Sequence, residues 1–223
     1  MSIIKRIQYN SPVILTYAIV SLILCVINYL TNAPNQLLFS VYRSSFADPF
    51  TYIRLIGHVL GHRDFSHYLN NFLLILLVGP MLEEKYGSVR MLVIMLITAI
   101  ITGAIFVLVS SKALLGASGI VFMLILLSSF ANFKRGGIPL TLVLVIIAYI
   151  GNEVYQGFAS ANTVNNISHF THIIGGLCGA AAGFFIHSGK IEKVEEPADG
   201  KPADSKPADS KPAEIQESKV TES

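Results

Sequence analysis

Charged side chains are scarce over most of this chain. The first 189 of its 223 residues hold only ten Lys or Arg and five Asp or Glu, about 8% of that stretch. An average soluble domain has about 25% charged residues, and a soluble fold with so few charges could not cover its surface. The chain is 52% hydrophobic and its mean hydropathy is +0.60. The sequence therefore predicts an integral membrane protein with a short polar tail. The net charge of +2, without a basic stripe, does not suggest a nucleic-acid partner.

Six apolar runs are long enough to cross a bilayer core, which takes about 20 residues. They cover approximately residues 12–30, 67–82, 91–110, 114–133, 138–157 and 167–187. The fifth run is the weakest because Gly151, Asn152 and Glu153 interrupt it. The first run could instead be a cleaved signal peptide, but it is longer than a typical signal segment, so we expect a retained helix. We predict an all-α, polytopic membrane domain over residues 1–189.

The short loops predict the orientation. If the N-terminus is inside, eight Lys or Arg lie on the inner side and four on the outer side, as the positive-inside rule favours. The inner set is Lys5, Arg6, Lys85, Arg90, Lys134, Arg135, Lys190 and Lys193, and the outer set is Arg43, Arg54, Arg63 and Lys112. We therefore expect both termini in the cytoplasm and the protein in the plasma membrane.

Two segments outside the spans differ in character. The outer loop 31–66 is too long for a simple connector and rich in apolar residues, so we expect it to be folded and partly sunk into the outer leaflet, although it could be only a lid. Residues 190–223 repeat Lys-Pro-Ala-Asp-Ser, and a proline every fifth residue without apolar partners predicts a disordered cytoplasmic tail.

Polar residues gather where the even-numbered spans begin. The second span opens with His67 and Asn71, the fourth with Gly116-Ala117-Ser118-Gly119, and the sixth with His169 and His172. Because even-numbered spans run in the same direction, these starts lie at similar depth near the outer face. Polar groups inside a membrane are costly and indicate function. We therefore expect Asn71, Ser118 and His172 to lie at one level.

A stripe of glycines suggests how two of these spans meet. Gly175, Gly179 and Gly183 recur every fourth residue of the sixth span and permit close approach of another helix. His172 lies three residues before Gly175, on the same face. If the stripe packs against the fourth span, His172 is carried towards Ser118.

These residues resemble the motifs of the rhomboid family of intramembrane serine proteases. Residues 67–71 fit its H-x-x-x-N motif, residues 116–119 its G-x-S-G motif, and residues 172–175 its H-x-x-G motif. Residues 78–88 resemble the end of the same core helix, with Glu83 at the expected place and expected to bind a neighbouring backbone or a base such as Arg90. The resemblance covers about residues 53–183, and the order of the motifs is more specific than any motif alone.

The resemblance implies a six-helix rhomboid-like bundle that cuts membrane proteins in or next to their transmembrane segments. It implies a catalytic dyad rather than a triad, no cofactor or metal, and a polar cavity that opens to the outer face. The implied site comprises Ser118 and His172 as catalytic residues, His67, Asn71 and Gly116 in oxyanion and substrate binding, and Phe122 and His169 as supporting residues.

Two positions depart from the family's pattern. Ile53-Arg54 stands where the family has Trp-Arg in the outer loop, and Phe122 stands where a Tyr is frequent. Phe122 can still stack on His172, without a phenol hydrogen bond. Neither change removes a reacting group, so the resemblance still implies activity.

Three other functions fit parts of the sequence. Five outer histidines could hold a metal, namely His58, His62, His67, His169 and His172, but no H-E-x-x-H occurs and a metal site would leave Ser118 without a role. A non-catalytic relative that binds transmembrane clients would be expected to lose Ser118 or His172. A transporter is a third candidate, but no inverted repeat is visible.

Overall fold

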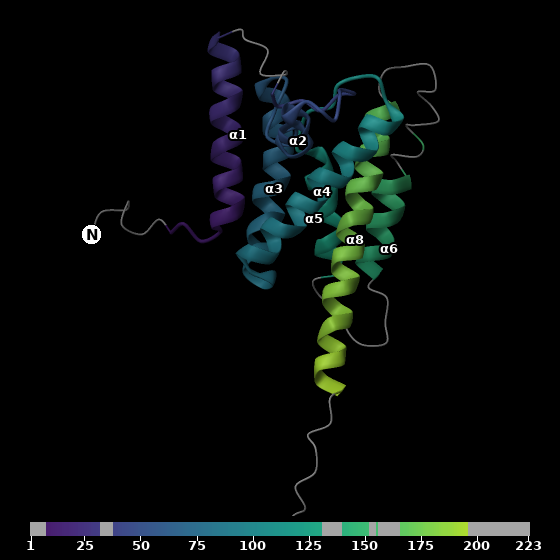
Figure 1. Cartoon of the computed structure of the whole chain (residues 1–223). Helices are drawn as coiled ribbons and strands as arrows, with labels where there is room; N and C mark the ends of the chain where they lie inside the picture. Colours follow the sequence, from purple (N-terminus) through teal and green to yellow (C-terminus); the bar gives the residue numbers. More distant parts are fainter. Residues whose placement is uncertain (1–7, 32–37, 131–139, 152–154, 156–165, 196–223) are drawn as a thin grey trace, which may run out of the picture.

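The computed structural model describes residues 8–31, 38–130, 140–151, 155 and 166–195. Within these ranges the chain is helical and forms no strand; its one β-bridge joins Val41 and Leu114. The helices are α1 (Pro12–Thr31), α2 (Pro49–Gly57), α3 (Phe65–Tyr86), α4 (Ser88–Val109), α5 (Ser118–Ser129), α6 (Leu140–Val145), the π-helix η3 (Ile146–Ile150) and α8 (Asn166–Glu195) (Figure 1).

Three helices are long and apolar enough to cross a membrane. They are α1 with 20 residues and α3 and α4 with 22 residues each. Helix α5 and the apolar part of α8, Thr171–Ile186, are shorter. The protein is therefore an all-helical integral membrane protein, as predicted. The count of six spans stays a prediction, because both ends of the fifth apolar run lie outside the described residues.

Two helix boundaries differ from those expected. The fourth apolar run was expected to start near residue 114, but α5 begins at Ser118. The preceding residues are held extended, since Leu114 and Val41 exchange both backbone hydrogen bonds at 2.9 Å. Helix α8 continues to Glu195, eight residues beyond the expected 187. It ends two residues before Pro197, and a proline disfavours helical geometry in the residue before it.

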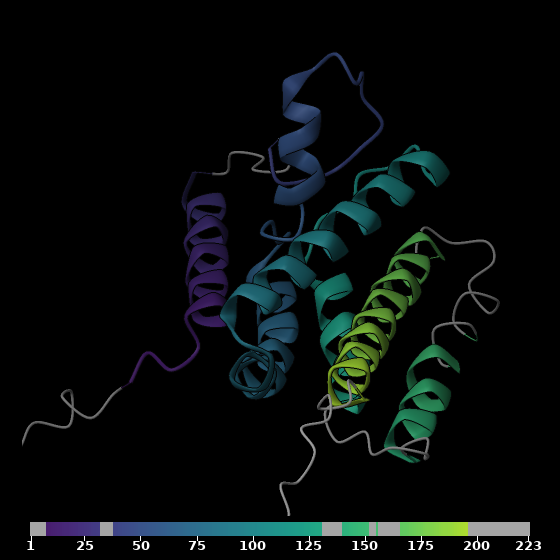
Figure 2. The ribbon, with the colours of Figure 1, turned by 60° about the horizontal axis from the view of Figure 1, so that its bottom comes forward.

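Helix α5 lies in the middle of the described bundle. It packs most extensively against α8 and also contacts α3 and α4. Nearly all of its residues are buried, from Gly119 to Leu127 without interruption. In Figures 1 and 2, α1 stands at one side of the molecule and α6 at the other. Helix α5 is thus enclosed along most of its length, whereas its first residue, Ser118, is only half-buried.

Glu83 joins α3 to α1 through backbone groups. Its carboxylate accepts hydrogen bonds from the N–H of Val13, at 3.0 Å, and of Ile14, at 2.9 Å. These donors belong to the first turn of α1, where N–H groups have no partner within the helix. The side chain of Glu83 is buried at 2% exposure. The expectation that Glu83 binds a neighbouring backbone is confirmed.

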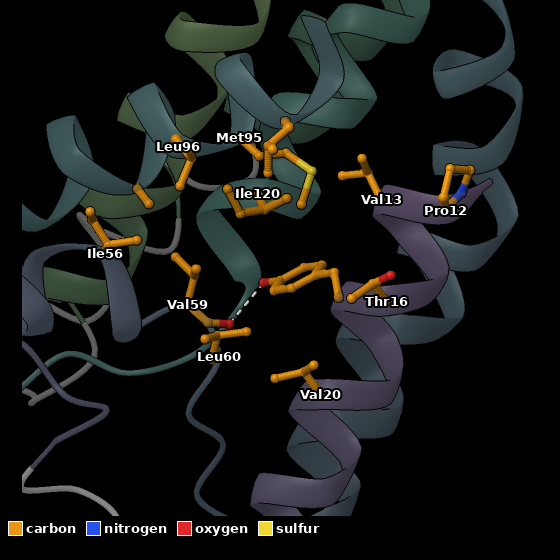
Figure 3. Close-up of a pocket in the computed structure, with 13 residues that line it drawn as sticks. Pro12, Val13, Thr16, Val20, Ile56, Val59, Leu60, Met95, Leu96 and Ile120 are labelled. Carbon is orange, nitrogen blue, oxygen red and sulfur yellow. Dashed lines mark hydrogen bonds between the residues drawn. The ribbon is translucent and has the colours of Figure 1, made fainter. Parts of the chain in front are cut away.

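An apolar groove of about 440 Å³ lies between α1 and α4 (Figure 3). Val20 of α1, Leu96 of α4 and Ile120 of α5 are among its lining residues. Tyr17 and Val59 also line the groove, and the hydroxyl of Tyr17 donates to the carbonyl oxygen of Val59 at 2.8 Å. This bond connects α1 to the segment that follows α2. None of the candidate site residues lines the groove.

Candidate active site

The loop between α1 and α3 is folded where the structure describes it, as expected from its apolar content. It contributes Val41 to the bridge with Leu114. Two residues further on, Gly116 N–H donates to the carbonyl oxygen of His58 at 2.9 Å. The segment that leads into Ser118 is therefore held by backbone hydrogen bonds from two separate parts of this loop.

Arg54 organises the interior of that loop. It is buried at 8% exposure, and its Nη1 pairs with Asp48 Oδ2 at 3.0 Å. Its guanidinium lies over the ring of Tyr42, 4.6 Å from the centroid. Asp48 also caps α2 by accepting from Phe50 N–H. The neighbouring Ile53, which replaces the family's Trp, is 53% exposed, so this replacement leaves the Arg54 contacts in place.

Ser118 is the first residue of α5 and is half-buried. The turn before it depends on Gly116, whose φ of +125° is rarely adopted by residues with a side chain. A Cβ at this position would also lie 2.7 Å from His67 Cε1. Gly116 therefore lets the imidazole of His67, from the start of α3, lie directly against the turn that presents Ser118.

The start of α3 is fixed by Asp64. Its Oδ1 accepts from His67 N–H at 2.8 Å and caps the helix. One turn later, Asn71 Nδ2 donates to the carbonyl oxygen of His67 at 3.0 Å, and Asn71 is 7% exposed. An amide nitrogen has two hydrogens, so this bond uses one of its two donors.

The glycine stripe of α8 packs against α5, which is the condition under which the sequence brings His172 towards Ser118. A Cβ on Gly175 would fall on the carbonyl oxygen of Gly119, and a Cβ on Gly179 would fall on that of Met123. A Cβ on Gly183 would lie 2.5 Å from the ring of Phe130. The two helices can approach this closely only because these positions lack side chains.

His172 lies on this same contact face. Its ring is stacked on Phe122, with centroids 4.6 Å apart and an interplanar angle of 8°. Phe122 is four residues after Ser118, so both side chains lie on one face of α5. His172 is also within Coulombic range of His67. The structure thus brings the starts of α3, α5 and α8 together, as their common direction predicted.

The loop histidines have other surroundings. His58 is 1% exposed, and burial lowers its pKa to about 4. His62 is 4% exposed and its ring lies 5.1 Å from that of His67. Burial, and then the charge of His67, lower the pKa of His62 to about 4. Both are therefore packed as neutral rings.

No group of three His, Cys, Asp or Glu side chains suited to a metal occurs in the described part of the chain. The side chain of His169 lies outside the described residues, so its supporting role stays a prediction. The sequence analysis missed Asp64 as the residue that fixes His67. An acid three residues before a helical His67 is a recognisable cap signal that could have identified it.

The chain is similar to known proteins of one family. A family model described as the Rhomboid domain matches residues 49–189, more than half of the chain. The chain is 33% identical over 159 residues to a protein of Bacillus subtilis named Rhomboid protease GluP, covering 68% of this chain and 30% of that protein. It is 30% identical over 137 residues to Rhomboid protease GlpG of Haemophilus influenzae, covering 59% and 68%.

A mammalian protein is also similar. Rhomboid-related protein 2 of Mus musculus is 28% identical over 149 residues, which cover 60% of this chain and 48% of that protein. The chain thus spans less than a third of the Bacillus protein and about half of the mouse protein. The family match runs from the start of α2 to residue 189 within α8 and includes Ser118 and His172. This chain belongs to the rhomboid family.

Proposed function

We propose that this protein is an intramembrane serine endopeptidase that hydrolyses peptide bonds in or next to transmembrane segments of other membrane proteins. Ser118 is the nucleophile and His172 is the general base. The observation that carries the proposal is the parallel stacking of Phe122 on His172 beside the contact of Gly175 with Gly119. These contacts hold the start of α8 against the first turns of α5, where Ser118 lies.

The reaction follows acyl-transfer chemistry. Ser118 Oγ attacks the carbonyl carbon of the scissile bond while His172 takes the hydroxyl proton. His172 then gives this proton to the leaving amine, and water hydrolyses the acyl-enzyme by the same steps. General acid–base catalysis of this kind contributes about 10²–10⁴-fold.

When Ser118 attacks, negative charge develops on the carbonyl oxygen of the scissile bond. Hydrogen-bond donors beside Ser118 must stabilise this charge. The backbone N–H of Ser118, the second hydrogen of Asn71 Nδ2 and the imidazole of His67 fill this role. Gly116 contributes to oxyanion and substrate binding because, without a side chain, it lets the His67 imidazole lie directly against the turn that presents Ser118. Loss of one such donor costs about 10²–10³ in turnover. Phe122 keeps the ring of His172 in one plane. His169, which is on α8 with His172, has a supporting role.

The domain extent, membrane orientation and location that we propose are those that the sequence predicts. Residues 1–189 form the protease domain, the termini are cytoplasmic, and the site opens to the outer face of the plasma membrane. Water must reach this site, because hydrolysis consumes it and the hydrocarbon excludes it. The substrates proposed are single-span membrane proteins.

Cleavage of a model single-span substrate in vesicles tests the proposal. Wild type and Ser128→Ala should cleave it equally, because Ser128 lies at the far end of the same helix from Ser118 and, among the described residues, its hydroxyl donates to the carbonyl oxygen of Ile125. Ser118→Ala and His172→Ala should abolish cleavage, and Asn71→Ala should reduce it about 10²–10³-fold. Equal cleavage by wild type and Ser118→Ala would overturn the proposal. Substrate capture without any cleavage by wild type would favour the non-catalytic client binder instead.

A further inference from the structure

A second cavity, of about 600 Å³, lies where α1 ends and α3 begins. Its volume is within the range of about 300–1,000 Å³ that is usual for small-molecule sites. It is lined by Cys25, Val26, Asn28, Tyr29, Arg63, Asp64, Phe65 and Ser66. None of these is a candidate catalytic or oxyanion residue, so the cavity is distinct from the proposed active site.

The wall of the cavity is apolar, and polar side chains stand beside it at the ends of the two helices. Cys25 and Val26 lie inside the apolar run of α1, whereas Asn28 lies in its last turn. Arg63 and Asp64 immediately precede α3. Because α1 and α3 both span the membrane, their ends lie at the depth of the lipid headgroups. The apolar cavity therefore lies next to the polar interface, with the exposed side chains of Arg63 and Asp64 beside it.

Aromatic residues mark the same depth. Tyr29 is 82% exposed and Phe65 is 58% exposed. Tyrosine in particular is enriched where membranes meet water. These exposed rings stand at the level where a lipid's glycerol and headgroup would be.

The exposed side chains of Arg63 and Asp64 offer both signs of charge beside the cavity. Arg63 Nε donates to Asp64 Oδ2 at 2.9 Å, and the two side chains are 75% and 45% exposed. This bond uses one of the five N–H donors of the guanidinium. Each carboxylate oxygen of Asp64 accepts one hydrogen bond from the described residues and has a second lone pair. An adjacent cation and anion match a headgroup that itself carries both charges.

We propose that this cavity binds a phospholipid of the surrounding bilayer that has a phosphoethanolamine headgroup. The lipid phosphate accepts from Arg63, and the ammonium donates to Asp64. The upper part of an acyl chain lies along Cys25 and Val26. A choline headgroup has no N–H to donate to Asp64, so the site distinguishes the two common zwitterionic lipids.

The position of this site gives it a consequence for the neighbouring active site. Asp64 caps α3 and holds His67 N–H, and His67 lies against Gly116. A lipid bound to Arg63 and Asp64 therefore contacts the residue that fixes the start of α3. Its binding is measurable directly and does not depend on the proposed protease activity.

Native mass spectrometry of the full chain tests the proposal. The protein is released from detergent micelles that contain equal amounts of phosphatidylethanolamine and phosphatidylcholine. Wild type should retain phosphatidylethanolamine in preference. Arg63→Gln should bind it about tenfold more weakly, the effect of losing a charge-assisted hydrogen bond. Lys112→Gln is the matched control, since Lys112 is exposed and does not line the cavity, and it should bind as wild type does.

Two further variants separate the parts of the site. Asp64→Asn keeps a good helix cap and removes the charge, so it should lose the preference for ethanolamine over choline. Val26→Trp leaves the charges of Arg63 and Asp64 in place and fills the apolar cavity. It should therefore also weaken binding about tenfold. Equal retention of the two lipids by wild type would overturn the proposal. So would unchanged binding in Arg63→Gln or Val26→Trp, or an equal loss in Lys112→Gln.

Discussion

The ring of Phe122 lies parallel to that of His172, with an interplanar angle of 8° and centroids 4.6 Å apart. This stack joins the helix that begins with Ser118 to the helix that carries the proposed base. It also shows that the Tyr frequent at this position in the family is not needed for the ring contact.

Removing the stack should slow catalysis without weakening substrate binding. Phe122→Leu keeps an apolar side chain but loses the ring, and an aromatic pair contributes about 0.5–1.5 kcal/mol. We expect kcat to fall about 2–10-fold with little change in KM. Phe122→Tyr should behave as wild type. Steady-state cleavage kinetics in vesicles measure this, and an effect confined to KM would show that Phe122 binds substrate instead.

Adding a side chain where α5 and α8 are in close contact should destabilise the protein. An alanine at 175 would place its Cβ on the carbonyl oxygen of Gly119, so the helices must separate. We expect Gly175→Ala to lower the free energy of unfolding by about 1–3 kcal/mol. Denaturant titration in detergent measures this change.

Gly176→Ala is the matched control for that experiment. Its Cβ would meet only the Leu126 side chain, at an ordinary 3.6 Å. Since alanine is a better helix former than glycine, this variant should be neutral or slightly more stable. Equal losses in both variants would contradict the close contact at Gly175.

The carboxylate of Glu83 should contribute strongly to stability. Glu83→Ala leaves the N–H groups of Val13 and Ile14 without their acceptor, which should cost about 2–3 kcal/mol in the free energy of unfolding. Glu83→Gln keeps one acceptor oxygen and should lose less. The neighbouring Glu84 is exposed, so Glu84→Ala should change stability by less than about 0.5 kcal/mol. A Glu83→Ala variant as stable as Glu84→Ala would contradict this role.

Acidification should destabilise the loop that contains His58 and His62. Their pKa values are lowered from 6.5 to about 4, so the unfolded chain binds protons that the folded chain does not. Their contribution to stability is full above pH 6.5 and is lost as the pH falls towards 4. The slope is about 1.4 kcal/mol per pH unit for each histidine.

The variant His62→Phe tests this dependence. A phenylalanine can occupy the site, because His62 contacts the rings of Tyr68 and Phe72 at centroid distances of 5.5 Å. The loss of unfolding free energy between pH 6.5 and pH 4 should then be shallower by about 1.4 kcal/mol per pH unit. An unchanged slope would mean that His62 is not the titrating group.

Much of the helical framework was predictable, because the length of an apolar run sets the length of a membrane helix. The first run was expected at 12–30 and α1 covers Pro12–Thr31. The glycine spacing predicted the face of α8 that meets α5. Chain direction alone predicted that the starts of α3, α5 and α8 lie at one level.

Contacts made by the loop could not be predicted in this way. The bridge between Val41 and Leu114 joins residues 73 positions apart and follows no periodic pattern. It delays the start of α5 to Ser118, although the apolar run begins earlier. Likewise, nothing in the spacing indicates that His58 offers its backbone carbonyl, rather than its ring, to Gly116.

The most direct test of the central claim is covalent labelling with a fluorophosphonate, mapped to the residue by mass spectrometry. One adduct is expected, on Ser118, which should form in wild type and in Ser128→Ala and be lost in His172→Ala because the base is gone. Labelling at another serine, or labelling of Ser118 at the same rate without His172, would contradict a nucleophile activated by that histidine.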